Sequence, residues 1–318
     1  MPLVSVVVPT HLRPDLVTRA VRSVQDQSVE DLEIVVVVDG RDAATVHALE
    51  EIGDPRLRTC VPERNLGNAG ARNLGIAAAR GEWVALLDDD DLWHPRKLER
   101  QLAVAAEVLA PLPVISCRFE AVSPQARYVW PKSFPRPGQP VGDYLFTRRG
   151  PSVEGAVQTS TFLVRRALFE AVSFDEALNR YVDLDWLLRA AQVEGFALVF
   201  AGGEPLSSYS IDDERARISN EPDWRRDVDW IHDRRHLVSR RAYGGYLLTQ
   251  ASIRAERTRD RSAFLPLFAD ALRNGRVSAG EVVFHTANTF LPRSFRRRLT
   301  SRPAGGVSAT GEELPDER

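Results

Sequence analysis

The stretch Trp83-Val84-Ala85-Leu86-Leu87-Asp88-Asp89-Asp90-Asp91-Leu92-Trp93 decides the fold. Its first five residues are apolar and predict a buried strand. Four consecutive carboxylates follow at the strand end, where like charges repel one another and have little structural use. A hard divalent cation such as Mg²⁺ or Mn²⁺ relieves that repulsion, because these ions prefer carboxylate oxygens and take further ligands from water and phosphates. The stretch therefore predicts a metal–diphosphate site at the mouth of a sheet.

A simpler interpretation of the acidic run is the N-terminus of a following helix. Asp91 precedes the pair His94-Pro95, where a helix is expected to begin. Acidic side chains stabilise that end of a helix. One or two acids are enough for this role, so the run as a whole favours the metal site, with Asp91 as the expected helix cap.

The bulk composition is that of an ordinary globular protein. The chain has 318 residues, of which 43% are hydrophobic and 27% charged. Its net charge of −2 gives no basic field, so no nucleic-acid partner is expected. The two cysteines, Cys60 and Cys117, lack the spacing of a metal site. No apolar run approaches the roughly 20 residues that span a bilayer, and the chain begins with a strand instead of a signal peptide, so we expect a cytoplasmic protein.

Short apolar runs alternate with helical patterns through the first half of the chain. This alternation predicts an α/β fold with a mixed, mainly parallel sheet and helices on both faces. Ligands of such sheets bind beyond the carboxyl ends of the strands, and Thr10, Asp39 and the run from Asp88 to Asp91 all follow strand ends. Strands are expected at residues 3–8, 33–38, 58–61, 83–87, 114–119, 157–164, 197–200 and 206–209.

The second half of the chain changes in character. Residues 123–142 contain five prolines and predict an irregular loop, whereas a helical, arginine-rich pattern begins near residue 223. The last residues are small and polar, as in disordered tails. We therefore expect an α/β domain over residues 1–215, a helical C-terminal extension over 216–302 and a disordered tail over 303–318.

Four motifs occur in the order and spacing of a known family. They are Val6-Val7-Val8-Pro9-Thr10, Val37-Val38-Asp39-Gly40, Asn65-Leu66-Gly67-Asn68-Ala69-Gly70-Ala71-Arg72-Asn73-Leu74-Gly75 and Leu87-Asp88-Asp89-Asp90-Asp91-Leu92-Trp93. Over roughly residues 1–210 the chain resembles the family 2 glycosyltransferases of the GT-A fold. The resemblance implies transfer of a sugar from a nucleotide-diphosphate sugar to an acceptor hydroxyl, with inversion at the anomeric carbon and with Mn²⁺ or Mg²⁺ as cofactor.

The resemblance assigns donor-binding roles to residues at the strand ends. Pro9, Thr10 and Arg13 would lie against the base and ribose of the donor. Asp39 would accept a hydrogen bond from a ring N–H of the base. The structural alternatives are a threonine cap at a helix entry and an ordinary Asp-Gly turn.

Two positions near this predicted base site depart from the family pattern. Val38 stands where the family often has another acid and Arg41 where it often has serine, so the identity of the base stays open. In the following motif, Asn68 and Arg72 are expected at the nucleotide, since an arginine can pair with an anionic group. The small residues of the same motif would equally allow a helix to pack closely on the sheet.

The acidic motif of the family is Asp-x-Asp, and Asp88 and Asp90 fit it. By this resemblance Asp90 is the metal ligand, Asp88 contacts the ribose or a metal-bound water, and Asp89 also faces the nucleotide. Because the four aspartates are consecutive, the register of the motif is ambiguous by one residue.

The segment Val182-Asp183-Leu184-Asp185-Trp186 resembles the acidic-pair helix of the family. An inverting displacement needs one carboxylate to accept the proton of the attacking hydroxyl, and Asp183 occupies that position. Val182 replaces the usual acidic or amide neighbour. Asp185 is the rival base, and the two project about 200° apart on a helix, so they cannot share the role. Both acids would also suit a helix N-terminus electrostatically.

Further candidates border the expected acceptor site. The family often has an arginine at the position of Ser210, and a loop arginine could replace it. The basic region from Arg293 to Arg298 suggests peripheral contact with the inner face of a membrane, with a solvated helix end as the alternative. The acceptor and loop candidates are His94, Thr161, Asp185, Trp186 and Arg215, with Arg217 as an alternative to Arg215.

Two other functions remain open at the level of sequence. A nucleotidyltransferase generally carries a glycine-rich loop after its first strand, and the segment from Pro9 to Arg13 has no glycine. A catalytically impaired nucleotide-sugar-binding protein is suggested by Val182 and Ser210. The acids at the strand ends argue against it.

Overall fold

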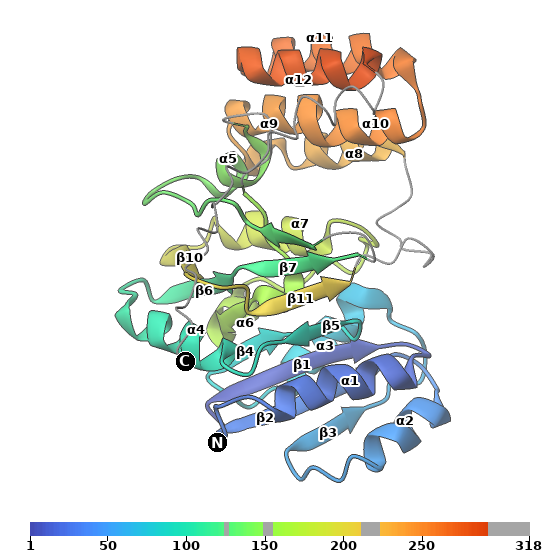
Figure 1. Ribbon diagram of the computed structural model, residues 1–318, viewed down its shortest axis with the longest axis vertical. Coiled ribbons are helices and arrows are strands. Elements are labelled where there is room, and N and C mark those ends of the chain that lie inside the picture. The colour runs from blue at the N-terminus through green and yellow to red at the C-terminus, as the bar shows by residue number, and fades with distance from the viewer. Residues whose placement is uncertain (124–126, 149–154, 211–222, 292–318) are drawn as a thin grey trace, which may run out of the picture.

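A computed structural model describes residues 1–123, 127–148, 155–210 and 223–291 (Figure 1). A seven-stranded sheet forms its centre, with the strand order β10-β6-β9-β4-β1-β2-β3. Adjacent strands are parallel except at β9, which runs antiparallel to both β4 and β6. The prediction of a mixed, mainly parallel sheet is confirmed. Its strands are β1 (Val4–Thr10), β2 (Leu32–Val38), β3 (Leu57–Cys60), β4 (Trp83–Leu86), β6 (Leu112–Cys117), β9 (Leu163–Arg165) and β10 (Phe196–Ala201).

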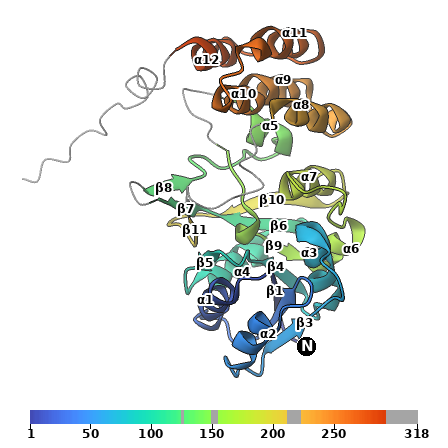
Figure 2. The same cartoon turned by 90° about the vertical axis from the view of Figure 1, so that its right-hand side faces the viewer.

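Helices cover both faces of this sheet, which explains why its strands are continuous apolar runs. Successive residues of β1 point to opposite faces: Val6 and Val8 join the cluster that contains α1 and α4, whereas Val7 joins the cluster that contains α3. Figure 2 shows α1 and α3 on opposite sides of the strands. The helices of this part are α1 (Pro14–Gln25), α2 (Ala43–Glu50), α3 (Gly67–Ala78), α4 (Lys97–Glu107), α5 (Val141–Phe146), α6 (Arg166–Ala171) and α7 (Val182–Ala190).

A second, four-stranded sheet has the order β5-β11-β7-β8. Its last strand overturns the prediction of an irregular loop over residues 123–142. The described prolines of this segment lie between β8 and α5, at 131, 135, 137 and 140. Because β8 pairs antiparallel with β7 over residues 127–130, these prolines do not interrupt the hydrogen-bond ladder. The strands are β5 (Asp91–Trp93), β7 (Phe119–Val122), β8 (Arg127–Trp130) and β11 (Ser207–Ser210).

The prediction of a strand over residues 157–164 is also wrong for the first half of that range. Thr159–Thr161 forms a 3₁₀ turn, and β9 begins only afterwards at Leu163. The hydroxyl of Thr161 donates to the carbonyl of Gln158 at 2.6 Å. Such local bonds compete with a strand ladder, and the turn brings Gln158 and Thr159 to the sheet edge.

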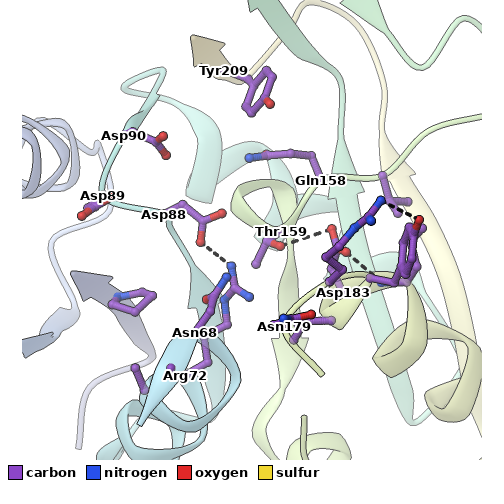
Figure 3. A pocket seen from close by; sticks show the side chains of 18 of the residues that line it. Asn68, Arg72, Asp88, Asp89, Asp90, Gln158, Thr159, Asn179, Asp183 and Tyr209 are labelled. Atoms are coloured by element: carbon purple, nitrogen blue, oxygen red, sulfur yellow. Dashed lines mark hydrogen bonds and ion pairs between the residues drawn. The ribbon is translucent and has the colours of Figure 1, made fainter. Parts of the chain in front are cut away.

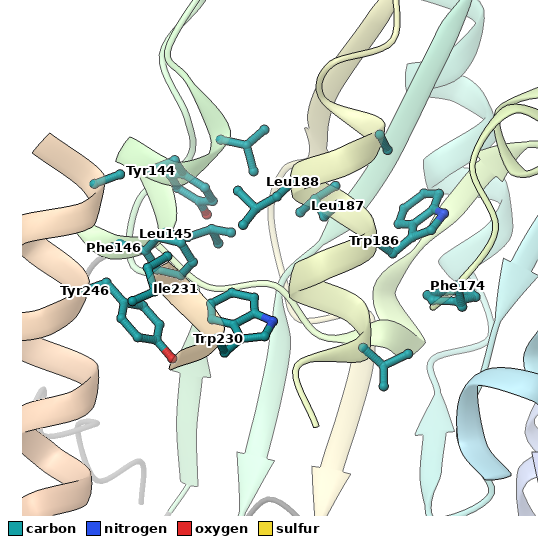
Figure 4. Packing of buried hydrophobic residues seen from close by; sticks show 14 of the residues in the cluster. Tyr144, Leu145, Phe146, Phe174, Trp186, Leu187, Leu188, Trp230, Ile231 and Tyr246 are labelled. Carbon is teal, nitrogen blue, oxygen red and sulfur yellow. The ribbon is translucent and has the colours of Figure 1, made fainter. Parts of the chain in front are cut away.

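The C-terminal region is helical from Trp224 onward, as predicted, and lies against α5 (Figure 1). The ring of Phe146 in α5 is 6.4 Å from that of Trp230 and 5.0 Å from that of Tyr246, so one apolar cluster continues from the sheet into the extension (Figure 4). Among the described residues, no helix is long and apolar enough to cross a membrane. The helices are α8 (Trp224–Asp233), α9 (Arg240–Tyr246), a π-helix (Leu247–Ala251), α10 (Ser252–Arg257), α11 (Phe264–Asn274) and α12 (Ala279–Phe290).

The predicted tail over residues 303–318 and the basic region from Arg293 to Arg298 lie outside the described residues. The domain limits at residues 215 and 302 stay predictions. What the structure adds is that the extension shares its apolar core with the α/β part.

The close packing of α3 on the sheet gives a test of the fold. A Cβ atom added at Gly75 would lie 2.4 Å from Cγ1 of Val7, in a fully buried place. We expect Gly75→Ala to lower the free energy of unfolding by about 1–3 kcal/mol, measured by urea denaturation. Gly280→Ala is the matched control, because the nearest atom to its added Cβ is 3.9 Å away. Equal stability of the two variants would contradict this packing.

Candidate active site

A pocket of about 800 Å³ opens at the carboxyl ends of β1, β2 and β4. Figure 3 shows Asp88, Asp89 and Asp90 on one side and Asp183 on the other, with Gln158 and Thr159 between them. The segments before α7 and the helical extension complete the wall. The convergence of strand ends that the sequence predicted is therefore present.

Asp89, within the acidic run, is held by protein donors. Asp89 is buried and accepts hydrogen bonds from Oγ1 of Thr10 at 2.7 Å and Nη1 of Arg13 at 3.1 Å. Burial raises the pKa of the Asp89 carboxyl. Thr10 and Arg13 thus line the pocket while their side chains hold Asp89 in place.

Asp91 is the second acid that is held by the protein. It is 1% exposed and accepts hydrogen bonds from Oγ of Ser160 at 2.6 Å and from Gln158. Burial, followed by the charge of Asp88, raises its pKa well above the ordinary range. The predicted helix-cap role is wrong, because Asp91 begins strand β5 and helix α4 starts only at Lys97.

Asp88 and Asp90 are only partly buried, and both line the pocket. Asp89 and Asp90 form a turn that the backbone N–H of Asp91 closes onto the carbonyl of Asp88 at 3.1 Å, and this turn leaves Asp89 and Asp91 more deeply buried than Asp88 and Asp90. This difference in burial favours the Asp-x-Asp register of Asp88 and Asp90.

Arg72 in α3 connects the acidic run with the opposite wall. It is 2% exposed and forms an ion pair with Asp88. Its charge also lowers the pKa of Asp183, against the larger effect of burial. Asn68, one turn earlier on the same helix, is exposed and lines the pocket.

Asp183 lies in the first turn of α7. Its carboxylate accepts hydrogen bonds from Oγ1 of Thr159 at 3.3 Å and from the backbone N–H of Leu184 at 2.9 Å. Burial raises its pKa. Tyr181, with a left-handed φ of 60°, makes the turn that leads into the helix.

Asp39 has a structural role at the edge of the pocket. Its two carboxylate oxygens accept the backbone N–H groups of Leu66, at 2.6 Å, and Gly67, at 3.0 Å, just before and at the start of α3. The following Gly40 has a φ of +96°, which glycine adopts without strain. Because Asp39 also lines the pocket together with Pro9, the turn and a ligand contact are compatible.

Four of the acceptor candidates lie outside the lining of this pocket. Asp185 is 1% exposed and pairs with Arg189 and Arg234, each at 2.7 Å. Its carboxylate is saturated by these arginines, so it does not suit the role of the base. Trp186 is fully buried in the core, the buried Thr161 forms a hydrogen bond with Ser116, and His94 lies in an exposed loop. Arg215 and Arg217 fall outside the described residues.

The sequence reasoning did not find the contribution of the helical extension. Tyr246, Gln250 and Arg254 line the pocket, as does Asp227 of α8. A spacing of four residues puts the first three on one face of a helix, and this spacing was a usable signal. Arg180, between the predicted base and the extension, was also missed.

The model of the family described as "Glycosyl transferase family 2" matches residues 5–172. The chain belongs to glycosyl transferase family 2. This membership makes it a nucleotide-sugar-dependent glycosyltransferase, and the fold implied by the resemblance is confirmed.

Individual relatives agree with the family. The chain is 30% identical over 219 residues to the amylovoran biosynthesis glycosyltransferase AmsB of Erwinia amylovora, covering 65% of this chain and 69% of AmsB. It is 42% identical over 102 residues to the succinoglycan biosynthesis protein ExoO of Rhizobium meliloti (strain 1021), covering 32% of this chain and 29% of ExoO. The structure of S. aureus TarS 1–349 in complex with UDP-GlcNAc matches with a TM-score of 0.57 at 16% identity, covering 94% and 92% of the two chains. At that identity the likeness shows the fold alone.

The saturated environment of Asp185 gives a prediction that separates it from Asp183. Asp185→Ala leaves two arginines without their buried partner, so the free energy of unfolding should fall by about 3 kcal/mol, since both arginines keep some access to water. Asp183→Ala should cost much less. Chemical denaturation of both variants checks this, and a larger loss for Asp183 would reverse the two roles.

Proposed function

We propose that this chain is a metal-dependent, inverting glycosyltransferase that moves a sugar from a nucleotide-diphosphate sugar to an acceptor hydroxyl. The observation that carries the proposal is the arrangement of acids in one pocket. Asp183 lies across from Asp88 and Asp90, with Thr159 between the two sides (Figure 3). A base and a diphosphate site on opposite walls suit a single in-line displacement.

Asp183 acts as the base in this mechanism. As the acceptor oxygen bonds to the anomeric carbon, its proton passes to the Asp183 carboxylate. The bond from that carbon to the diphosphate breaks, and its electron pair leaves with the diphosphate. Hydrogen bonds from Thr159 and the Leu184 N–H fix the orientation of the carboxylate. Its burial raises the pKa, which makes it a stronger base.

On the donor side, the strand-end residues hold the nucleotide. Pro9, Thr10, Asp39 and Asn68 all line the pocket, and in this proposal they border the base and ribose. Arg72 acts on the nucleotide site by positioning Asp88 through their ion pair. The base of the nucleotide follows from none of these contacts.

Asp90, assisted by Asp88, would hold the divalent cation. Both offer carboxylate oxygens, the ligands that Mg²⁺ and Mn²⁺ prefer. Within the described parts of the chain, no three His, Cys, Asp or Glu side chains are grouped so that they could hold a metal ion, so the donor and water would have to supply further ligands. When bound, such an ion offsets the charge of the leaving diphosphate.

The relatives support a role in polysaccharide or glycoconjugate biosynthesis. AmsB and ExoO are named for the biosynthesis of amylovoran and succinoglycan, and the TarS structure holds UDP-GlcNAc. Asp183 argues against the alternative of a catalytically impaired protein, because it is held by two hydrogen bonds although Val182 replaces the usual polar neighbour.

Replacement of the base tests the mechanism. Asp183→Asn should lower the rate of sugar transfer, or of donor hydrolysis without acceptor, by about 10²- to 10⁴-fold. The nucleotide affinity should stay nearly unchanged, because Asp183 lies across from the diphosphate side. Asp31→Asn, an exposed change at the other end of the sheet, is the control. Undiminished turnover by Asp183→Asn would remove Asp183 from the role.

The pH dependence gives a second measurement of the same assignment. The base must be ionised, so kcat/KM should fall as the pH drops through the pKa of Asp183. Because burial raises that pKa, the fall should begin above the range of an ordinary aspartate. A rate that stays level into that ordinary range would contradict the assignment.

Nucleotide binding tests the donor and metal site. We expect UDP, GDP, dTDP or CDP, or one of their sugars, to raise the melting temperature with Mn²⁺ and much less with EDTA, because a ligand of the folded state stabilises it. Asp90→Asn should abolish the metal-dependent part, whereas Asp31→Asn should keep it. No shift with any nucleotide would favour the non-catalytic alternative.

A further inference from the structure

The helical extension builds a polar wall beyond the proposed base. Tyr246, Gln250 and Arg254 face the pocket from α9, the π-helix and α10, and Asp227 faces it from α8. The π-helix (Leu247–Ala251) lies within this wall. Such turns are rare and occur frequently at functional sites. This wall has no role in the reaction described so far.

Arg180 joins this wall to the base. It is 7% exposed and lines the pocket three residues before Asp183. Its Nη2 donates to Oη of Tyr181 at 2.9 Å and to Oδ1 of Asp227 at 3.3 Å. Among the residues that the structure describes, its Nε and Nη1 atoms find no hydrogen-bond partner.

This arrangement leaves two N–H-bearing nitrogens of Arg180 without an acceptor, although its third nitrogen contacts Asp227. An arginine stays charged in proteins and presents five N–H donors, and a buried charge is costly unless it is paired and hydrogen-bonded. Arg254 shares the same partner, with its Nε 3.6 Å from Oδ2 of Asp227. Two guanidinium groups therefore converge on one carboxylate at the edge of a pocket.

We propose that Arg180, together with Arg254, forms a subsite for an anionic group of the acceptor, a phosphate or a carboxylate. The fork of a guanidinium matches the oxygens of either group. This inference rests on the proposed function, since it takes the pocket as the site of transfer. It adds a charged acceptor class to a reaction whose acceptor was open.

The position of Arg180 favours the acceptor over the donor diphosphate. The donor diphosphate is expected beside Asp88 and Asp90, whereas Arg180 contacts Asp227 of the helical wall on the side of Asp183. In an in-line displacement the acceptor hydroxyl approaches opposite the leaving group. An anionic group next to that hydroxyl then reaches Arg180 without crossing the donor site.

The test uses small anions on the full chain. The protein is saturated with Mg²⁺ and the nucleoside diphosphate that gives the largest thermal shift, which blocks the donor phosphate site. Methyl phosphate and acetate are then titrated and followed by NMR. Arg180→Met should weaken binding of at least one anion by about tenfold or more, while Arg180→Lys should weaken it less. Arg136→Met, an exposed arginine outside the pocket, controls for net charge and should bind as the wild type does.

Each other result overturns the inference. If Arg180→Met instead lowers the affinity for the nucleotide, Arg180 belongs to the site of the donor diphosphate. If neither anion binds the wild type, or if Arg180→Met lowers only the melting temperature, the unpaired nitrogens bind water and Arg180 is structural. The anion titration is repeated without nucleotide to keep this inference separate from the proposed function. If the wild type binds an anion through Arg180 but binds no nucleotide, the proposed function fails and the anion subsite stands.

Discussion

The site depends on how four adjacent carboxylates are held at the end of β4. Their repulsion would oppose folding if all four were left ionised side by side. The protein compensates them individually: Asp89 by Thr10 and Arg13, Asp91 by Ser160 and Gln158, and Asp88 by Arg72. Burial also favours the protonated form of the two most enclosed members. The partners come from β1, α3 and the turn before β9, so the acidic run also joins separate parts of the fold.

A second constraint is the shared apolar core of the α/β part and the extension. Phe146 touches Trp230 and Tyr246, and behind it Leu187 and Leu188 of α7 belong to the same cluster (Figure 4). The helix that carries Asp183 is therefore packed from one side by the sheet and from the other by the extension. The position of the base consequently depends on residues more than 40 positions later in the chain.

The sequence could predict features of the fold that depend on one helix or strand at a time. The β-branched runs gave the parallel strands, and the order of strand ends gave the rim on which Thr10, Asp39 and Asp88 meet. The 3₁₀ turn at Thr159 escaped because a threonine hydroxyl outcompeted strand pairing. Strand β8 escaped because the prolines around it lie outside its ladder. The spacing of Tyr246, Gln250 and Arg254 indicates a shared helix face, but that this face lines the pocket depends on long-range packing, which no local pattern contains.

The same physical distinction sorts the acids on both sides of the pocket. In each cluster some carboxylates are enclosed by protein donors, as Asp185 is by two arginines, and these maintain structure. Asp183 also has two donors, but they are the uncharged hydroxyl of Thr159 and the backbone N–H of Leu184, and the residue lines the pocket. A carboxylate whose lone pairs are already taken cannot receive a proton or a metal without breaking its contacts. The charge of the donors and access to the pocket thus separate Asp183 from Asp185, which sequence alone left as rivals.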